Sequence, residues 1–107
     1  MIDDEDDADD ALPPVPEGGL IQVLPIINRR GLHARASAKF VQTVERFDAA
    51  VTVTRAGETV GGRSIMGLLT LGAAQGTSIA VVASGSDAQA CMQAITDLLA
   101  NKFGEDE

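Results

Sequence analysis

The order in which two apolar periodicities follow each other restricts the fold of this chain more than any other feature. An apolar side chain at every second position is typical of a half-buried strand, and apolar side chains at i, i+3 or i+4 and i+7 share one helix face. From residue 20 onward the order is strand, helix, strand, strand, helix, strand, helix. We expect these elements near residues 21–27, 34–47, 51–54, 59–60, 64–71, 77–83 and 86–99. Four strands with all three helices on one face form a two-layer α+β sandwich.

Three of the strand segments indicate their place in the sheet. Val51-Thr52-Val53-Thr54 alternates strictly, so we expect this strand to be buried on one face only. Residues 77–83 are apolar on both sides, which favours a central strand. Pro25 cannot donate to a backbone ladder, and its place within residues 21–27 therefore suits an edge strand.

Polar residues in front of apolar runs predict where the helices begin. Ser64 precedes a short run that ends at Gly72, and we expect this serine to be the N-cap. Ser86 followed by Gln89 is a capping-box pattern that predicts the start of the last helix. The apolar stripe of residues 34–47 consists of Phe40, Val41, Val44 and Phe47.

Charge is distributed unevenly along the chain. Residues 1–19 carry a charge of −8, residues 20–103 carry +3 and residues 104–107 carry −3. An acidic block followed by prolines and glycines has little apolar surface to offset the entropy of ordering. We therefore expect a disordered acidic extension at 1–19, a folded domain at 20–103 and an acidic C-terminal tail at 104–107. The extension would act as a solubilising segment or as an electrostatic shield over the basic part of the fold.

Composition also restricts partners and compartment. The acidic tail repels phosphate, and the chain has no Tyr or Trp for base stacking, so we expect no nucleic-acid partner. The sequence has no apolar run long enough to span a bilayer and no basic secretory leader, so we expect no membrane insertion. The single cysteine, Cys91, fits a reducing compartment, and we expect a cytoplasmic protein.

His33 is the only histidine of the 107 residues, and cationic side chains surround it in the sequence. Arg29, Arg30, Arg35 and Lys39 all lie within six positions of it. Free backbone N–H groups at a helix start bind anions readily. We interpret this cluster as an imidazole nucleophile that accepts a phosphoryl group, although a capping or surface histidine is the simpler alternative. No second histidine is available for a metal site, and we expect neither metal nor cofactor.

Two motifs together resemble a known family. Gly31-Leu32-His33-Ala34-Arg35 and Arg63-Ser64-Ile65-Met66-Gly67-Leu68-Leu69-Thr70-Leu71-Gly72 are similar to motifs of HPr, the histidine-containing phosphocarrier of the bacterial phosphoenolpyruvate-dependent phosphotransferase system. The resemblance covers about residues 20–103 and preserves the order of the elements. It implies an open-faced β-sandwich of βαββαβα order, with a four-stranded antiparallel sheet in the order 1-4-2-3.

The resemblance also implies a role for each residue of the first motif. His33 would accept a phosphoryl group through Nδ1 from Enzyme I and pass it to an enzyme IIA domain. Arg35 would stabilise the phosphoryl oxygens, together with the backbone N–H of Ala34. The chain would then be a monomeric intermediate in phosphoryl transfer rather than a stand-alone enzyme, in a branch that serves sugar transport or regulation.

Ser64 has two explanations. An N-cap role alone accounts for a serine at this position. The resemblance adds that an HPr kinase/phosphorylase modifies this position in many bacteria, and a phosphate at a helix start adds about two negative charges. We therefore expect regulatory phosphorylation of Ser64 that slows acceptance at His33. An alternative function is a regulatory docking module whose partner binding is controlled by Ser64.

A docking surface for both partners is expected around His33. The family resemblance assigns contacts to Leu32, Ala38, Ile65, Met66 and Leu69, and we add Arg30 and Arg63 for an acidic partner. Leu68 and Leu71 are expected in the core. One residue departs from the family pattern within the first helix, where Ala36 replaces a frequent proline.

Overall fold

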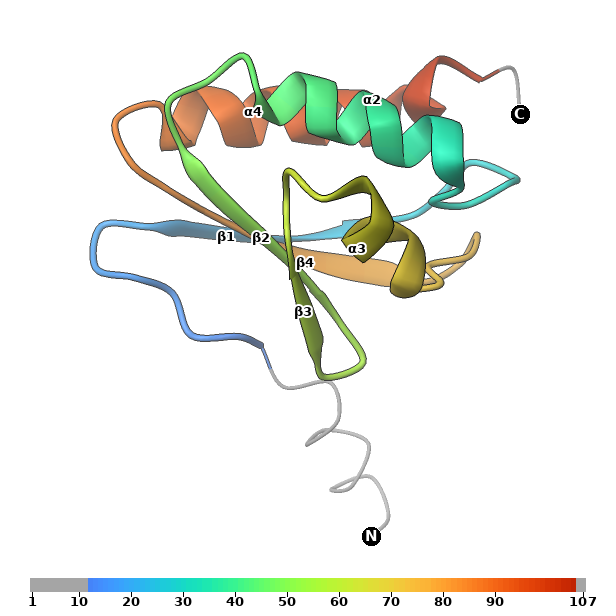
Figure 1. Ribbon diagram of the computed structural model, residues 1–107, viewed down its shortest axis with the longest axis horizontal. Helices are drawn as coiled ribbons and strands as arrows, with labels where there is room; N and C mark the ends of the chain where they lie inside the picture. Colours follow the sequence, from blue (N-terminus) through green and yellow to red (C-terminus); the bar gives the residue numbers. More distant parts are fainter. Residues whose placement is uncertain (1–11, 106–107) are drawn as a thin grey trace, which may run out of the picture.

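The computed structural model describes residues 12–105, which form a four-stranded antiparallel sheet and helices that cover one of its faces (Figure 1). The strands are β1 (Leu20–Pro25), β2 (Ala50–Arg55), β3 (Glu58–Gly61) and β4 (Ser78–Ser84). The helices are α2 (Ala34–Val44), α3 (Ile65–Thr70) and α4 (Ala88–Ala100), and the 3-10 turn η1 (Lys102–Gly104) follows α4. The strand order β1-β4-β2-β3 confirms the predicted α+β sandwich with the order 1-4-2-3.

The fully apolar strand β4 and the proline-containing strand β1 lie where the sequence predicts them, in the centre and at the edge of the sheet. β4 lies between β1 and β2, where Val81 is opposite Gln22 on one side and Val53 on the other. All five residues from Ile79 to Ala83 are buried, as expected for a central strand. Pro25 is opposite Ser78 at the end of β1, which is an edge strand. An edge strand tolerates proline because one side of it has no partner that needs the missing N–H.

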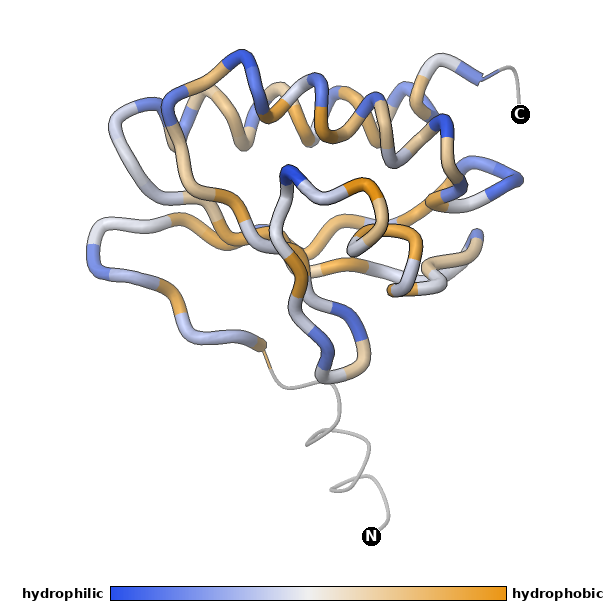
Figure 2. Tube along the Cα trace, viewed as in Figure 1, coloured by the Kyte–Doolittle hydropathy of each residue, from blue (hydrophilic) through white to orange (hydrophobic). Residues whose placement is uncertain are grey.

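The core lies between the sheet and the helices. Phe40 of α2, Leu68 of α3 and Ile95 of α4 are fully buried, and each faces the apolar side of the sheet. Figure 2 shows the same separation, with hydrophobic segments along the inner sides of the helices and strands and hydrophilic ones in the turns. Cys91 belongs to this core, and burial raises the pKa of its thiol, as expected for an unreactive structural cysteine.

The first helix is shorter than predicted. The helical pattern extends to Phe47, but α2 ends at Val44, and the N–H of Phe47 donates to the carbonyl of Val44 within a turn. The chain must reverse here to enter β2 at Ala50, so Phe47 stays half-buried against the core after the helix has ended.

The capping-box prediction for the last helix is wrong. Asp87 is the N-cap of α4 and makes no capping bond with its side chain. Its carboxylate instead accepts from the backbone N–H of Asp48 at 2.8 Å, and the Ser86 hydroxyl donates to the Asp48 carboxylate at 3.0 Å. Both polar side chains are therefore used to join the turn after α2 to the turn before α4, a long-range contact that local pattern does not reveal.

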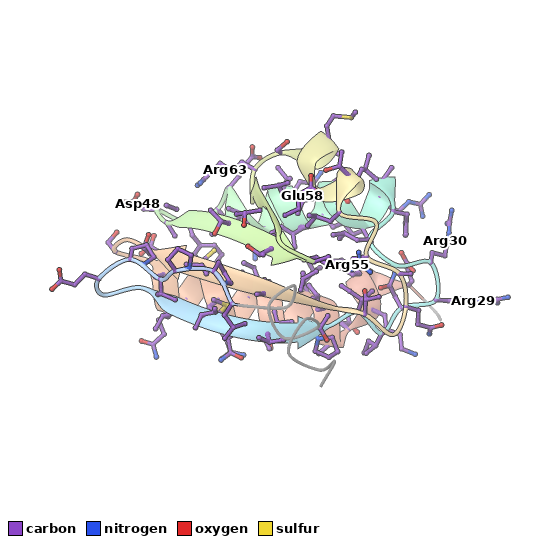
Figure 3. All side chains as sticks on the ribbon, turned by 90° about the horizontal axis from the view of Figure 1, so that it is seen from below. Arg29, Arg30, Asp48, Arg55, Glu58 and Arg63 are labelled. Atoms are coloured by element: carbon purple, nitrogen blue, oxygen red, sulfur yellow. The ribbon has the colours of Figure 1, made fainter. Side chains whose placement is uncertain are left out.

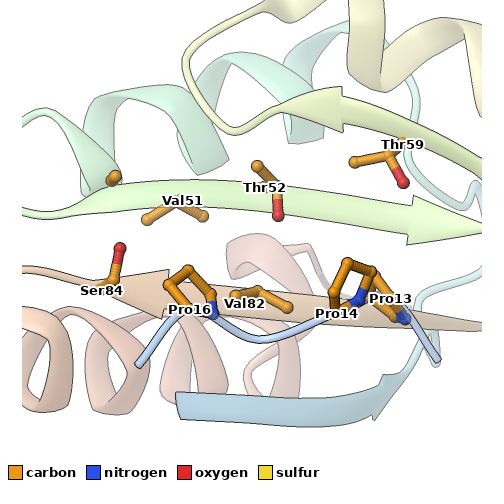
Figure 4. Close-up of a pocket in the computed structure, with 9 residues that line it drawn as sticks. Pro13, Pro14, Pro16, Val51, Thr52, Thr59, Val82 and Ser84 are labelled. Carbon is orange, nitrogen blue, oxygen red and sulfur yellow. The ribbon is translucent and has the colours of Figure 1, made fainter. Parts of the chain in front are cut away.

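Residues 12–19 run back under the sheet on the face that the helices leave open (Figure 1). A turn closed by the bond from Gly19 N to Pro16 O at 2.8 Å reverses the chain just before β1. Pro13, Pro14 and Pro16 line a pocket of about 360 Å³ whose floor is formed by β2, β3 and β4, including Val82 and Thr52 (Figure 4). The acidic part of the predicted extension, residues 1–11, lies outside the described residues.

Between residues 12 and 105, no helix has the length and apolar character that crossing a membrane requires.

Candidate functional site

A tight loop between β1 and α2 sets the position of His33. Gly31 has φ +70°, and a Cβ at this position would lie 2.6 Å from the carbonyl oxygen of Ala73. Glycine is therefore required, both for the left-handed backbone and for the close approach of the loop that follows α3. The N–H of Leu32 donates to the same Ala73 carbonyl at 2.9 Å, which fixes the residue that precedes His33.

His33 is the N-cap of α2. Its backbone is extended, with φ −79° and ψ −176°, and its carbonyl accepts the first helical bond from Ser37 N at 2.8 Å. Its Nδ1 accepts the N–H of Arg35 at 3.2 Å, so the imidazole itself caps the helix start. A nitrogen that accepts a hydrogen bond carries a lone pair, and Nδ1 is therefore the unprotonated nitrogen of the ring.

The other ring nitrogen meets a carboxylate from the end of the chain. Nε2 of His33 is in direct hydrogen-bond contact with Oε2 of Glu105, and the two side chains are only 18% and 15% exposed. A carboxylate can only accept, so Nε2 carries the ring proton. Desolvation raises the pKa of the Glu105 carboxyl, but hydrogen bonds from His33 and Asn28 outweigh this effect and hold the pKa below its ordinary value.

Asn28 supports this contact from inside the loop. It is fully buried, and its Nδ2 donates to Gly31 O at 2.8 Å and to Oε1 of Glu105 at 3.1 Å. Both partners are pure acceptors, so only the amide NH₂ can face them and the orientation of the amide is fixed. Its Oδ1 is buried and accepts no hydrogen bond from the described residues, which costs about 1–3 kcal/mol.

The C-terminal segment is anchored well enough to place Glu105. Phe103 is 1% exposed, and its backbone is left-handed with φ +56°. Nζ of Lys39 donates to the Phe103 carbonyl at 2.7 Å, and the N–H of Glu105 donates to Lys102 O at 2.9 Å. Lys39, one of the cationic residues near His33 in the sequence, therefore joins α2 to this segment.

The arginines are divided between two ends of the fold. Arg29 and Arg30 project outward from the loop before His33, whereas Arg63 lies at the opposite end near Asp48 (Figure 3). Arg63 donates to Ala49 O at 2.9 Å and to Phe47 O at 3.2 Å. These bonds join the loop before Ser64 to the turn after α2, so Arg63 has a structural role, while its docking role stays a prediction.

Ser64 occupies the predicted N-cap of α3. Its Oγ accepts the N–H of Gly67 at 2.9 Å, and its carbonyl accepts that of Leu68 at 3.0 Å. The side chain is exposed, so the hydroxyl is accessible although it serves as a cap.

The predicted docking residues separate into exposed and buried ones. Met66 is 70% exposed and Ile65 is 39% exposed, while Leu68 and Leu71 are buried as predicted. Leu32 is only 5% exposed and packs in the core, so its side chain is unavailable for docking. The predicted docking residues that are exposed or partly exposed are Arg30, Ala38, Arg63, Ile65, Met66 and Leu69.

This geometry can hold a small negatively charged group beside Nδ1. The first turn of α2 offers backbone N–H groups at Ala34 and Arg35, and the positive end of the helix dipole favours negative charge there. The exposed Arg35 side chain starts from the same turn. No cluster of three or more potential metal ligands is present among residues 12–105.

The comparison with known families shows to which family the chain belongs. A family model described as "PTS HPr component phosphorylation site" matches residues 22–101. The chain belongs to the HPr family. It is a phosphocarrier of the phosphotransferase system, and HPr proteins work within a chain of phosphoryl transfers.

Individual HPr proteins agree with this assignment. The HPr of Neisseria meningitidis serogroup A is 50% identical over 88 residues, which cover 82% of this chain and 99% of that protein. The HPr of Xylella fastidiosa strain Temecula1 is 46% identical over 83 residues, covering 78% and 93% of the two chains. The crystal structure of HPr-C-His from Thermoanaerobacter tengcongensis superposes with a TM-score of 0.79 at 38% identity, covering 82% and 99%.

Sequence reasoning missed two members of the site, Asn28 and Glu105. The sequence places Glu105 in an acidic tail, yet its side chain contacts His33, which lies 72 positions away in the sequence. The available signal was Phe103, an apolar side chain after the end of the last helix. Such a residue indicates that the chain still packs on the core, and Glu105 follows it by two positions.

Proposed function

We propose that His33 is the residue that carries the phosphoryl group, through Nδ1, and that Enzyme I is the donor and an enzyme IIA domain the acceptor. The observation that carries this assignment is the position of Nδ1, whose lone pair faces the first-turn N–H of α2 at 3.2 Å. Once Nδ1 is phosphorylated, that N–H and the N–H of Ala34 become donors to the phosphoryl oxygens. The guanidinium of Arg35 adds a charge-assisted contact.

The transfer needs no cofactor, because positioning and charge stabilisation supply most of the catalysis in phosphoryl transfer. Chain composition and the family assignment support a cytoplasmic, monomeric carrier. The exposed residues Ile65, Met66 and Leu69 provide apolar contacts for the two partners in turn, and Met66 adapts readily to different surfaces. Arg30 favours an acidic partner surface through its charge.

The test is intact mass spectrometry after incubation with phosphoenolpyruvate and Enzyme I. Wild type should gain one acid-labile phosphoryl group, and His33→Ala should gain none. An Ala36→Gly control removes no charge and should still be phosphorylated. Absence of phosphorylation of wild type by an active Enzyme I would refute the assignment.

Regulatory phosphorylation of Ser64 by a kinase of the HPr kinase/phosphorylase type is the second part of the proposal. The exposed hydroxyl at the start of α3 supports it, because a phosphate there is stabilised by the helix start. Ser64→Asp should slow the phosphorylation of His33 by Enzyme I, since it places negative charge on the docking face. Equal rates for Ser64→Asp and wild type would contradict this role.

A regulatory docking module controlled by Ser64 alone is the alternative function. It would require normal, Ser64-dependent partner binding by His33→Ala, in the absence of any phosphoryl transfer. The same variant therefore separates the two functions.

A further inference from the structure

Glu105 touches the reactive imidazole on the side away from its nucleophilic nitrogen. We propose that Glu105, oriented by Asn28, is a positioning residue for phosphoryl transfer: it holds the proton on Nε2 and thereby keeps the lone pair of His33 on Nδ1. The inference rests on the proposed role of His33 and adds to it a pair of residues outside both family motifs.

A carboxylate is the group that fits this position. Its two oxygens face two donors at once, Nε2–H of His33 and Nδ2–H of Asn28. Because Asn28 is fully buried and also bonded to Gly31 O, its NH₂ cannot turn away from Glu105. One anionic side chain therefore couples the buried loop amide to the ring.

The segment that carries Glu105 is part of the folded core. Phe103 is buried at 1% exposure, and Lys39 binds its carbonyl at 2.7 Å. Glu105 follows a closed turn, with its own N–H bonded to Lys102 O. Glu105 therefore lies two residues after the side chain that anchors this segment in the core, and its own backbone is held by a hydrogen bond.

The proton arrangement has a direct consequence for the chemistry. The lone pair of Nδ1 forms the N–P bond, while the bond from phosphorus to Enzyme I breaks and its electron pair stays on the Enzyme I atom. The proton remains on Nε2, so the ring becomes a positively charged phosphoimidazolium. The Glu105 carboxylate beside Nε2 stabilises that charge. With the proton on Nδ1 instead, the nucleophilic lone pair would point at Glu105 and away from the donor.

The decisive variant is Glu105→Gln, which keeps the shape and removes the second acceptor. If the Gln oxygen faces His33, its NH₂ meets the NH₂ of Asn28, and two donors oppose each other. If the oxygen faces Asn28, the Gln NH₂ selects the other tautomer, whose Nδ1–H then opposes the N–H of Arg35. Glu58→Gln is the matched control, because Glu58 is an exposed acid on β3 and makes the same change in charge.

Two measurements are made on wild type, Glu105→Gln and Glu58→Gln. Imidazole ¹⁵N chemical shifts report the fraction of each tautomer of His33, and rapid-quench assays with phosphoenolpyruvate and Enzyme I report the rate of phosphorylation. We expect a larger Nδ1–H fraction and about a tenfold slower rate for Glu105→Gln, equivalent to one lost hydrogen bond to a charged group, and wild-type behaviour for Glu58→Gln.

The proposal is overturned if Glu105→Gln has the tautomer fractions of wild type, or if the fractions change and the rate does not. Asn28→Ala supplies a second readout, since loss of the orienting amide should change the ¹⁵N shifts in the same direction. The tautomer measurement requires no phosphorylation. It therefore judges the role of Glu105 on the ring even if wild type fails to accept phosphate and the proposed function is wrong.

Discussion

Removal of the Phe103 side chain should damage both the stability of the fold and the geometry around His33. Phe103 is 1% exposed, and it is the last apolar side chain of the described chain to enter the core. Phe→Ala changes at buried positions cost about 3–5 kcal/mol, because a cavity remains where the ring was. A domain of this size has a total stability of about 5–15 kcal/mol, so Phe103→Ala should remove a large part of it.

The backbone of Phe103 allows a second, more discriminating comparison. With φ +56°, any side chain at this position bears the cost of a left-handed conformation, about 1–2 kcal/mol, which glycine avoids. Glycine loses about 0.5–1 kcal/mol more chain entropy on folding than alanine. Phe103→Gly should therefore be as stable as Phe103→Ala or slightly more stable, whereas glycine is the less stable of the two at an ordinary position.

Urea unfolding followed by circular dichroism measures these differences, provided that the free energy of unfolding falls with urea concentration at the same slope in all variants. Met66→Ala is the control, since a side chain that is 70% exposed should change the free energy of unfolding by less than about 0.5 kcal/mol. A loss below about 1 kcal/mol for Phe103→Ala would show that the ring is not in the core. A glycine variant less stable than the alanine variant would contradict the left-handed backbone.

Three further outcomes follow from individual contacts. Ser64→Ala removes the acceptor of the Gly67 N–H and should lower the free energy of unfolding by about 1 kcal/mol in urea titrations, and no loss would show that the hydroxyl is not a cap. Met66→Glu should leave the melting temperature unchanged but raise the KM of Enzyme I for this substrate, and an unchanged KM would remove Met66 from the docking face. The folded pKa of Glu105 is lowered, so its stabilisation is present above the unfolded pKa and is lost as the pH falls through the folded pKa. The stability difference between wild type and Glu105→Gln should accordingly shrink as the pH falls below the ordinary pKa of a glutamate carboxyl, whereas a constant difference would mean that the carboxylate has no favourable partner in the folded state.

Elements determined by local pattern were predictable from the sequence. The strict alternation of Val51 to Thr54 and the two-sided apolar run of β4 place both strands correctly, because side-chain period and burial are properties of the segment itself. The cap at Ser64 is predictable for the same reason, since its partner is only three residues away.

Contacts between distant segments were not predictable. The carboxylate of Asp87 caps nothing in its own helix because the N–H of Asp48, 39 positions away, competes for it. The structural role of Arg63 is another example, because its Nη1 and Nη2 groups donate to the carbonyls of Ala49 and Phe47, which lie 14 and 16 positions away in the sequence. Glu105 belongs to the same class, because only the folded chain brings the C-terminal turn beside the His33 loop.

The capping of α2 by His33 has a thermodynamic consequence. Nδ1 accepts the Arg35 N–H only while its lone pair is free, and bond formation to phosphorus ends that role. Under the proposed function, phosphorylation of His33 therefore replaces one helix cap by another, and the difference between the two caps enters the free energy of the N–P bond. By linkage, any free energy with which the folded state stabilises the phosphoryl group appears as an equal increase in the free energy of unfolding of the phosphorylated form. The melting temperatures of the two forms thus report how far the fold itself sets the phosphoryl-transfer potential of the carrier.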